Sequence, residues 1–178
     1  MRTRWIRFNL YLGLTGLLLA ACQSQKSKQH SQLTTLRIHV QTNGTDTNHV
    51  EVISVFRRQP LQLKIEKEPI ISERDISEAK IVAAVGGFSI RLQFAHQGNL
   101  LLEQYSSMNR GKHLAIFSQF ADQPGGPINS GRWLAAPMIT RPIRDGTLEF
   151  APDATREEAE QIVLGLNNDA RRLENNPK

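Results

Sequence analysis

The stretch Phe-Ser-Ile-Arg-Leu-Gln-Phe (residues 88–94) alternates apolar and polar side chains more cleanly than any other part of the chain. Strict alternation is typical of a β-strand with one buried and one exposed face. The preceding segment, Lys80 to Val85, is also predicted to be a strand, and Gly86-Gly87 between the two fits the turn of a β-hairpin. The sequence therefore predicts an antiparallel hairpin as the centre of the fold.

Shorter segments with the same two-residue period lie on both sides of this hairpin. Leu36, Ile38 and Val40 fall on one face of a predicted strand, and Arg37, His39 and Gln41 fall on the other. Further strands are expected at residues 49–56, 61–65, 114–120, 133–140 and 147–150. Their uncovered polar faces favour antiparallel pairing, in which one side of a sheet meets solvent.

Two segments have a helical period instead. Leu101, Tyr105 and Met108 are spaced as one face of a helix that Gly111 ends. Residues 155–158 form a capping box, which predicts a second helix with a buried face. That face consists of Ala159, Ile162, Val163 and Leu166. The predicted fold class is α+β, with an antiparallel sheet covered on one face by two main helices.

The N-terminal segment has the composition of a bacterial export signal. Three arginines precede a run of 12 residues without a charged side chain, at positions 10–21. A membrane-spanning helix needs about 20 apolar residues, so this run has the length of a signal peptide instead. Leu19-Ala20-Ala21-Cys22 resembles a lipobox, the cleavage site of bacterial lipoprotein precursors. An ordinary signal peptide cut elsewhere, with Cys22 incidental, is the alternative.

The lipobox interpretation divides the chain into four parts. These are a signal peptide at 1–21, a lipidated polar tether at 22–34, the α+β domain at 35–168 and a polar tail at 169–178. Acyl chains on Cys22 would anchor the protein to a membrane. We therefore expect a location in the cell envelope, facing the periplasm. Gln23 after the cysteine favours the outer membrane if the host is Gram-negative.

Composition excludes several classes of protein. Removing residues 1–21 leaves 157 residues with 19 Lys and Arg against 17 Asp and Glu, a net charge of +2. A net charge this small does not predict the strongly basic surface that nucleic-acid-binding proteins have. Cys22 is the only cysteine, so no disulfide is expected once it carries lipid. The fold must then depend on its apolar core, which a chain of this length can form.

No motif in the sequence calls for catalysis. The five histidines are not spaced with cysteines, carboxylates or one another as metal ligands are. His39 and His49 are interpreted as side chains on a solvated strand face. Phosphate-binding loops and nucleophile elbows are absent from the sequence. We expect neither enzymatic activity nor a cofactor or metal.

Several short segments between residues 69 and 168 follow one another in a recognisable order. They are residues 71–76 with Ala79, 88–94 with Gly98, 111–116, 135–139 with Ile143, and 147–150 followed by 154–159. In this order they resemble the periplasmic P1 head subdomain of the SecD and SecDF subunits of the bacterial protein translocase. The resemblance implies an α+β head that contacts polypeptide leaving the translocon. Proton-coupling membrane helices are not expected, because a polar tail follows Leu166.

These observations predict a lipid-anchored binding module that contacts exported polypeptide or an export or assembly partner. Phe120 and Trp133 flank a Gly- and Pro-rich loop at 121–131 and are candidate apolar contacts, although both also suit a core. A structural lipoprotein subunit of a larger envelope complex is the alternative, and it would expose a large apolar patch. A hydrolase would instead need a cleft with clustered, perturbed ionisable groups.

Overall fold

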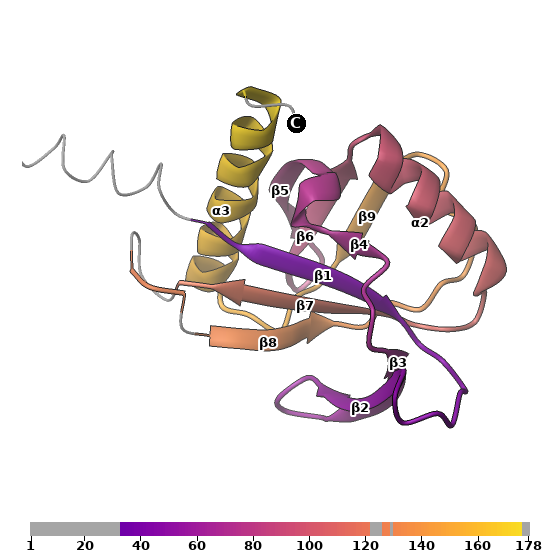
Figure 1. Ribbon diagram of the computed structural model, residues 1–178. Coiled ribbons are helices and arrows are strands. Elements are labelled where there is room, and N and C mark those ends of the chain that lie inside the picture. The colour runs from indigo at the N-terminus through magenta and orange to yellow at the C-terminus, as the bar shows by residue number, and fades with distance from the viewer. Residues whose placement is uncertain (1–32, 122–125, 129, 176–178) are drawn as a thin grey trace, which may run out of the picture.

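The computed structural model describes residues 33–121, 126–128 and 130–175 (Figure 1). Over these residues the chain alternates short strands with two long helices and one 3-10 turn, as the sequence predicted for an α+β domain. The elements are, in order, β1 (Thr35–Val40), β2 (Val50–Val55), β3 (Leu61–Glu66), β4 (Ile71–Ser72), η1 (Glu73–Asp75), β5 (Ile76–Ala84), β6 (Gly87–Phe94), α2 (His96–Met108), β7 (Leu114–Phe120), β8 (Ser130–Ala135), β9 (Thr147–Phe150) and α3 (Arg156–Asn175).

The strands form three antiparallel sheets in the described residues, where one was predicted. The largest has the order β4-β1-β7-β8, a second has the order β5-β6-β9, and β2 and β3 form a hairpin of their own. The predicted hairpin is β5 and β6, but its turn consists of Val85 and Gly86, because Ala84 pairs with Gly87. Gly86 has a φ of 81°, which a residue without Cβ adopts at little cost.

The main core lies between the four-stranded sheet on one side and the three-stranded sheet with both helices on the other (Figure 1). Leu36, Ile38 and Val40 of β1 face it, as their alternation predicted. Ile90 and Leu92 of β6 meet them from the opposite layer and are fully buried. Burial of each such side chain contributes about 1.5–3 kcal/mol, so this layer holds the sheets and helices together.

The second face of the four-stranded sheet is not solvated as predicted, because the β2–β3 hairpin covers part of it. Ile53 and Val55 of β2 and Ile65 of β3 pack with Ala115 of β7 in a second, smaller core. The assignment of His39 to a solvated face was therefore wrong, since its exposed fraction is 8%. The alternation fixed the face of each residue, but long-range packing decided what covers it.

The first helix, α2, packs Leu101 and Tyr105 against the main core, as predicted, but its most buried residues form a neighbouring stripe. Gly98, Leu102 and Ser106, four residues apart, are its buried residues, whereas Met108 is 73% exposed. Gly98 decides this orientation because a Cβ there would lie 2.7 Å from the backbone oxygen of Asp75. The close approach rotates α2 so that the glycine, and not Met108, faces its neighbour.

The last helix, α3, begins at the predicted capping box and extends beyond the predicted end. The Thr155 hydroxyl accepts from the Glu158 amide at 3.2 Å, and the Glu158 carboxylate accepts from the Thr155 amide at 2.7 Å. Ala159, Ile162 and Leu166 are fully buried, as predicted. The polar tail predicted at 169–178 is wrong for most of its length, because α3 continues to Asn175.

The N-terminal boundary of the domain also differs from the prediction. Thr34, assigned to the tether, is fully buried, and its amide donates to the Asp169 carboxylate at 3.3 Å. A Cβ on Gly165 of α3 would lie 2.0 Å from the Thr34 hydroxyl oxygen. Thr34 is therefore part of the folded domain and crosses α3 at its glycine.

Candidate functional site

The two candidate contact residues lie on opposite faces of the four-stranded sheet. Phe120 is fully buried in the main core, with the Arg132 guanidinium 5.1 Å from its ring centre. A partner cannot reach a fully buried ring, so the expectation of a contact at Phe120 was wrong. Trp133 is partly buried and packs against the second core, beneath the β2–β3 hairpin.

Trp133 belongs to an aromatic cluster next to a pocket. Its ring centre is 5.3 Å from that of His39 and 5.1 Å from that of Phe117. A pocket of about 410 Å³ opens beside Phe117 and Trp133, and Phe56, which follows β2, also lines it. These aromatic contacts explain Trp133 as packing for the hairpin, and they leave only part of the ring available to a ligand.

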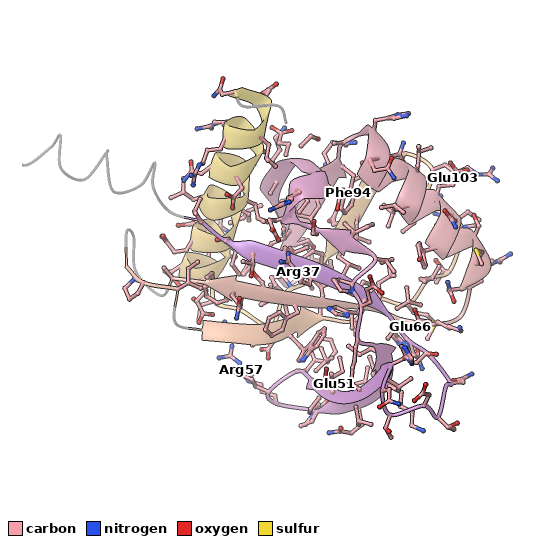
Figure 2. The ribbon with its side chains drawn as sticks, in the orientation of Figure 1. Arg37, Glu51, Arg57, Glu66, Phe94 and Glu103 are labelled. Atoms are coloured by element: carbon pink, nitrogen blue, oxygen red, sulfur yellow. The ribbon has the colours of Figure 1, made fainter. Side chains whose placement is uncertain are left out.

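A polar contact fastens the loop of the hairpin over this pocket. The Asp153 carboxylate accepts from the Arg57 amide at 2.8 Å and from its guanidinium at 3.2 Å. Partial burial acts to raise the pKa of Asp153. The hydrogen bonds from Arg57 and its positive charge have the larger combined effect, so the pKa of Asp153 is lowered. Figure 2 shows Arg57 and Glu66 at the two ends of the hairpin. The pocket is therefore closed on one side by a fixed loop.

Strand β5 offers a different kind of site, a sheet edge with unpaired backbone groups. The sheet order β5-β6-β9 leaves one side of β5 without a neighbouring strand. Both backbone groups of Ala79 face that side, because they bond to Asn167 of α3 and not to β6. Backbone groups alternate in direction along a strand, so those of Ile81 and Ala83 face the same side. No described residue pairs with them.

Asn167 occupies the place of a neighbouring strand at one end of this edge. Its side-chain oxygen accepts from the Ala79 amide at 2.8 Å, and its side-chain nitrogen donates to the Ala79 carbonyl at 2.9 Å. A side-chain amide has the same donor and acceptor as a peptide group. Asn167 therefore satisfies Ala79 as a strand would, and it marks where the unpaired part of β5 begins.

An apolar groove runs beside the unpaired part of the edge. Ile81 and Val82 of β5 line one side, and Val163 and Leu164 of α3 line the other, around a volume of about 440 Å³. The side chains of Lys80 and Glu160 add one charge of each sign to its lining. Natural proteins usually protect exposed edges with charges, proline or bulges. The run from Ile81 to Val85 contains neither a charged residue nor proline. We name the residues Ile81, Ala83, Val163 and Leu164 the β5 edge site.

The edge of β8 shows how the same fold protects a strand elsewhere. The backbone oxygen of Leu134 accepts from the Asp153 amide at 2.7 Å. The segment that carries Asp153 is itself fastened by Arg57. This contact blocks strand addition at Leu134, whereas the corresponding side of β5 past Ala79 is free of such a contact in the described residues.

The remaining predicted features concern chemistry and membrane attachment. Within the described residues, no three His, Cys, Asp or Glu side chains are placed to hold a metal ion. In the same part of the chain, no helix combines the length and apolar character needed to cross a membrane. Cys22 and the lipobox residues Leu19, Ala20 and Ala21 lie outside the described residues, so lipidation stays a prediction.

Comparison with protein families identifies the domain. The model for the SecDF P1 head subdomain matches residues 50–170, more than half of the chain. The chain belongs to the SecDF P1 head family. The match includes the β5 edge site and α3 as far as Ala170, whereas β1 precedes it. The family predicted from the order of the short segments is thereby confirmed.

Solved structures share the fold of this P1 head. One, described as SecDF in a super-membrane-facing form, is 22% identical with a TM-score of 0.55, covering 83% of this chain and 20% of that one. Another, described as a membrane component SecDF that enhances protein export, has the same identity and TM-score, covering 83% of this chain and 68% of that one. The chain thus spans about a fifth of the first relative. No curated protein matches.

Sequence reasoning missed the β5 edge site. The uncharged run from Ile81 to Val85 was the available signal, because five successive residues without charge or proline are unusual at a sheet edge. Whether β5 lies at an edge depends on the sheet order, which alternation does not encode. Asn167 gave no signal, since it follows the predicted end of the helix, where a polar residue is ordinarily solvated.

Proposed function

We propose that this P1 head is a lipid-anchored binding module of the bacterial envelope that holds segments of exported polypeptide at the β5 edge site. The observation that carries the proposal is the part of the β5 edge past Ala79, where unpaired backbone groups lie beside a largely apolar groove. A sheet edge recognises the backbone of an extended chain, which all polypeptides share. Such a site suits a protein that must hold many different sequences.

Membership of the SecDF P1 head family supports the same role. One solved relative is described as a membrane component that enhances protein export. The module would act on polypeptide outside the cytoplasm, where exported chains are still unfolded. It would work by binding alone, without catalysis, cofactor, metal or nucleic acid.

The lipobox supports attachment to a membrane. Cleavage before Cys22 and acylation of its thiol would leave the domain on a polar tether of 12 residues, at positions 22–33. An extended chain reaches about 3.3–3.6 Å per residue, so the domain would stay within roughly 40 Å of the membrane surface. The module would face the periplasm, with the outer membrane favoured by Gln23 in a Gram-negative host.

Photocrosslinking in living cells tests the proposal directly. A photoreactive amino acid is placed at Ala83 on the exposed edge, and a matched variant carries it at Gln104 on the exposed side of α2. We expect Ala83 to crosslink to a pulse-labelled exported protein in transit, and Gln104 not to. Crosslinking of neither position, or equal crosslinking of both, would exclude a role for this edge in holding polypeptide.

A second candidate function is a structural subunit of a larger envelope complex. The tip of the β5–β6 hairpin favours it, because Val85 is fully exposed and Ala83 and Ala84 next to it are also exposed. A permanent partner would cover this tip. Crosslinking from Ala83 to one protein, unchanged when protein synthesis is blocked, would favour the structural role, whereas transit substrates disappear under the block.

A further inference from the structure

We propose that the guest polypeptide binds by strand addition, as an antiparallel neighbour of β5 that pairs with Ile81 and Ala83. This inference rests on the proposed function and specifies the chemistry of the ligand: an extended segment with apolar side chains at alternate positions. The site would select backbone conformation and side-chain period. It would select no particular sequence.

The direction of the backbone groups on β5 supports pairing at Ile81 and Ala83. Ala84 and Gly87 flank the two-residue hairpin turn and form a hydrogen-bonded pair, so the backbone N–H and C=O of Ala84 face β6. The groups of Ala79 face outward, toward Asn167. Both observations give the same alternation, in which Ile81 and Ala83 each present one donor and one acceptor outward. A guest strand would satisfy all four groups.

The side chains of β5 determine the pattern that the guest must have. Ile81 lies opposite Ile90 and packs against the main core, so it points to the same side of the sheet as α3. Directly opposed residues of an antiparallel pair place their side chains on the same face. Guest residues opposite Ile81 and Ala83 would therefore point toward Val163 and Leu164, and apolar side chains are favoured there.

The other face of the guest would be polar. Lys80 and Glu78 form an ion pair at 2.7 Å and lie on the outer face of β5, opposite Arg91 and Gln93 of β6. Guest residues between the apolar ones would share this solvated side. Asn167 blocks extension past Ala79, so the paired part of the guest is short. A short paired segment gives weak binding that releases a moving chain.

The first test uses three synthetic peptides with the full-length protein purified in detergent. The probe is a fluorescent peptide of alternating Val and Thr, flanked by lysines. One analogue carries N-methyl groups at the Val amides, and the other carries them at the Thr amides. In an antiparallel pair the Val amides face β5, so methylation there should weaken binding about tenfold or more, measured by fluorescence anisotropy. Methylation at the Thr amides should have less than a twofold effect.

The second test uses variants of the protein. Ile81→Pro removes the outward N–H of β5 and leaves the N–H groups that face β6, whereas Ile81→Val keeps it. Leu164→Glu places a charge in the groove, and Leu173→Glu places the same charge on an exposed part of the same helix. We expect Ile81→Pro and Leu164→Glu to weaken probe binding about tenfold. Leu173→Glu, outside the site, should bind as the wild type does, and Ile81→Val should bind at least fivefold more tightly than Ile81→Pro.

The outcomes separate this inference from the proposed function. If the probe binds and both methylated analogues bind equally well, strand addition is wrong although polypeptide binding stands. Weakening by methylation at Thr alone would exclude the antiparallel arrangement. If no peptide binds and Ala83 gives no crosslink, both proposals fail. Because the methylated peptides are tested on the wild-type protein, a misfolded variant cannot obscure the result.

Discussion

The side-chain amide of Asn167 forms two hydrogen bonds with the backbone of Ala79, one as acceptor at 2.8 Å and one as donor at 2.9 Å. This pairing joins α3 to the edge of the three-stranded sheet. It also shortens the edge that is left open to a guest strand. One residue therefore contributes to stability and sets the extent of the proposed binding site.

Replacing Asn167 should destabilise the domain without abolishing peptide binding. Asn167→Ala removes both hydrogen bonds, and we expect the free energy of unfolding to fall by about 1–3 kcal/mol. Urea denaturation followed by circular dichroism measures the change. Binding of the alternating peptide should persist, because Ile81 and Ala83 are untouched. An unchanged unfolding midpoint would show that water replaces the amide without cost.

Gly165 should not tolerate a side chain. A Cβ there would lie 2.0 Å from the Thr34 hydroxyl oxygen and 2.9 Å from the Thr34 backbone nitrogen. Gly165→Ala should therefore destabilise the domain by about 1–3 kcal/mol despite the better helix propensity of alanine. Gly87→Ala is the control, because nothing lies within 4 Å of its Cβ. Equal thermal stability of the two variants would contradict the close contact.

His39 should make the stability of the domain depend on pH. Burial lowers the pKa of His39 below its ordinary value of 6.5, despite the hydrogen bond between its Nδ1 atom and the Glu66 carbonyl. The unfolded chain therefore binds a proton more readily than the folded one. The contribution of neutral His39 to the free energy of unfolding is complete above about pH 6.5. It is lost as the pH falls through the lower pKa that His39 has in the folded state.

A histidine titration and one variant test this expectation. The His39 ring should titrate below pH 6.5 in the folded protein, observed by NMR. His39→Gln should flatten the fall in the free energy of unfolding between pH 6.5 and pH 5. A slope that is the same in the variant would assign the pH dependence to other groups.

The lipobox predicts a specific processing defect. Cys22→Ala removes the thiol that would carry the acyl chain, so we expect precursor to accumulate and radiolabelled palmitate not to be incorporated. Immunoblotting of membrane fractions and fluorography measure the two effects. Labelling of the variant with palmitate would place the lipid elsewhere. Gln23→Ala is a matched control and should be processed normally.

The sequence predicted local features well because their signals are local. Alternation identified β1, β6 and β9, and the hydroxyl and carboxylate of the capping box located the start of α3. The order of these segments also identified the family. The sequence placed Leu101 and Tyr105 of α2 on the packed side correctly, but it missed the buried stripe that begins at Gly98, because a glycine carries no hydrophobic signal.

The candidate site depended on contacts between distant parts of the chain. Trp133 and Phe120 flank the same loop, but they face opposite cores, because neighbouring strand positions alternate across a sheet. The β5 edge became visible only when the sheet order and the bonds to Asn167 were known, 88 positions along the chain from Ala79.

The amino-acid sequence alone determined the α+β class, the periods of the strands and helices, and the predicted lipid anchor, since each depends on residues close in the chain. Only the tertiary structure decided that three sheets form, that the hairpin covers His39, and that β5 keeps an open edge. The physical reason is that a backbone group or an apolar face acquires its partner from the whole fold. Neighbours in the sequence do not specify that partner.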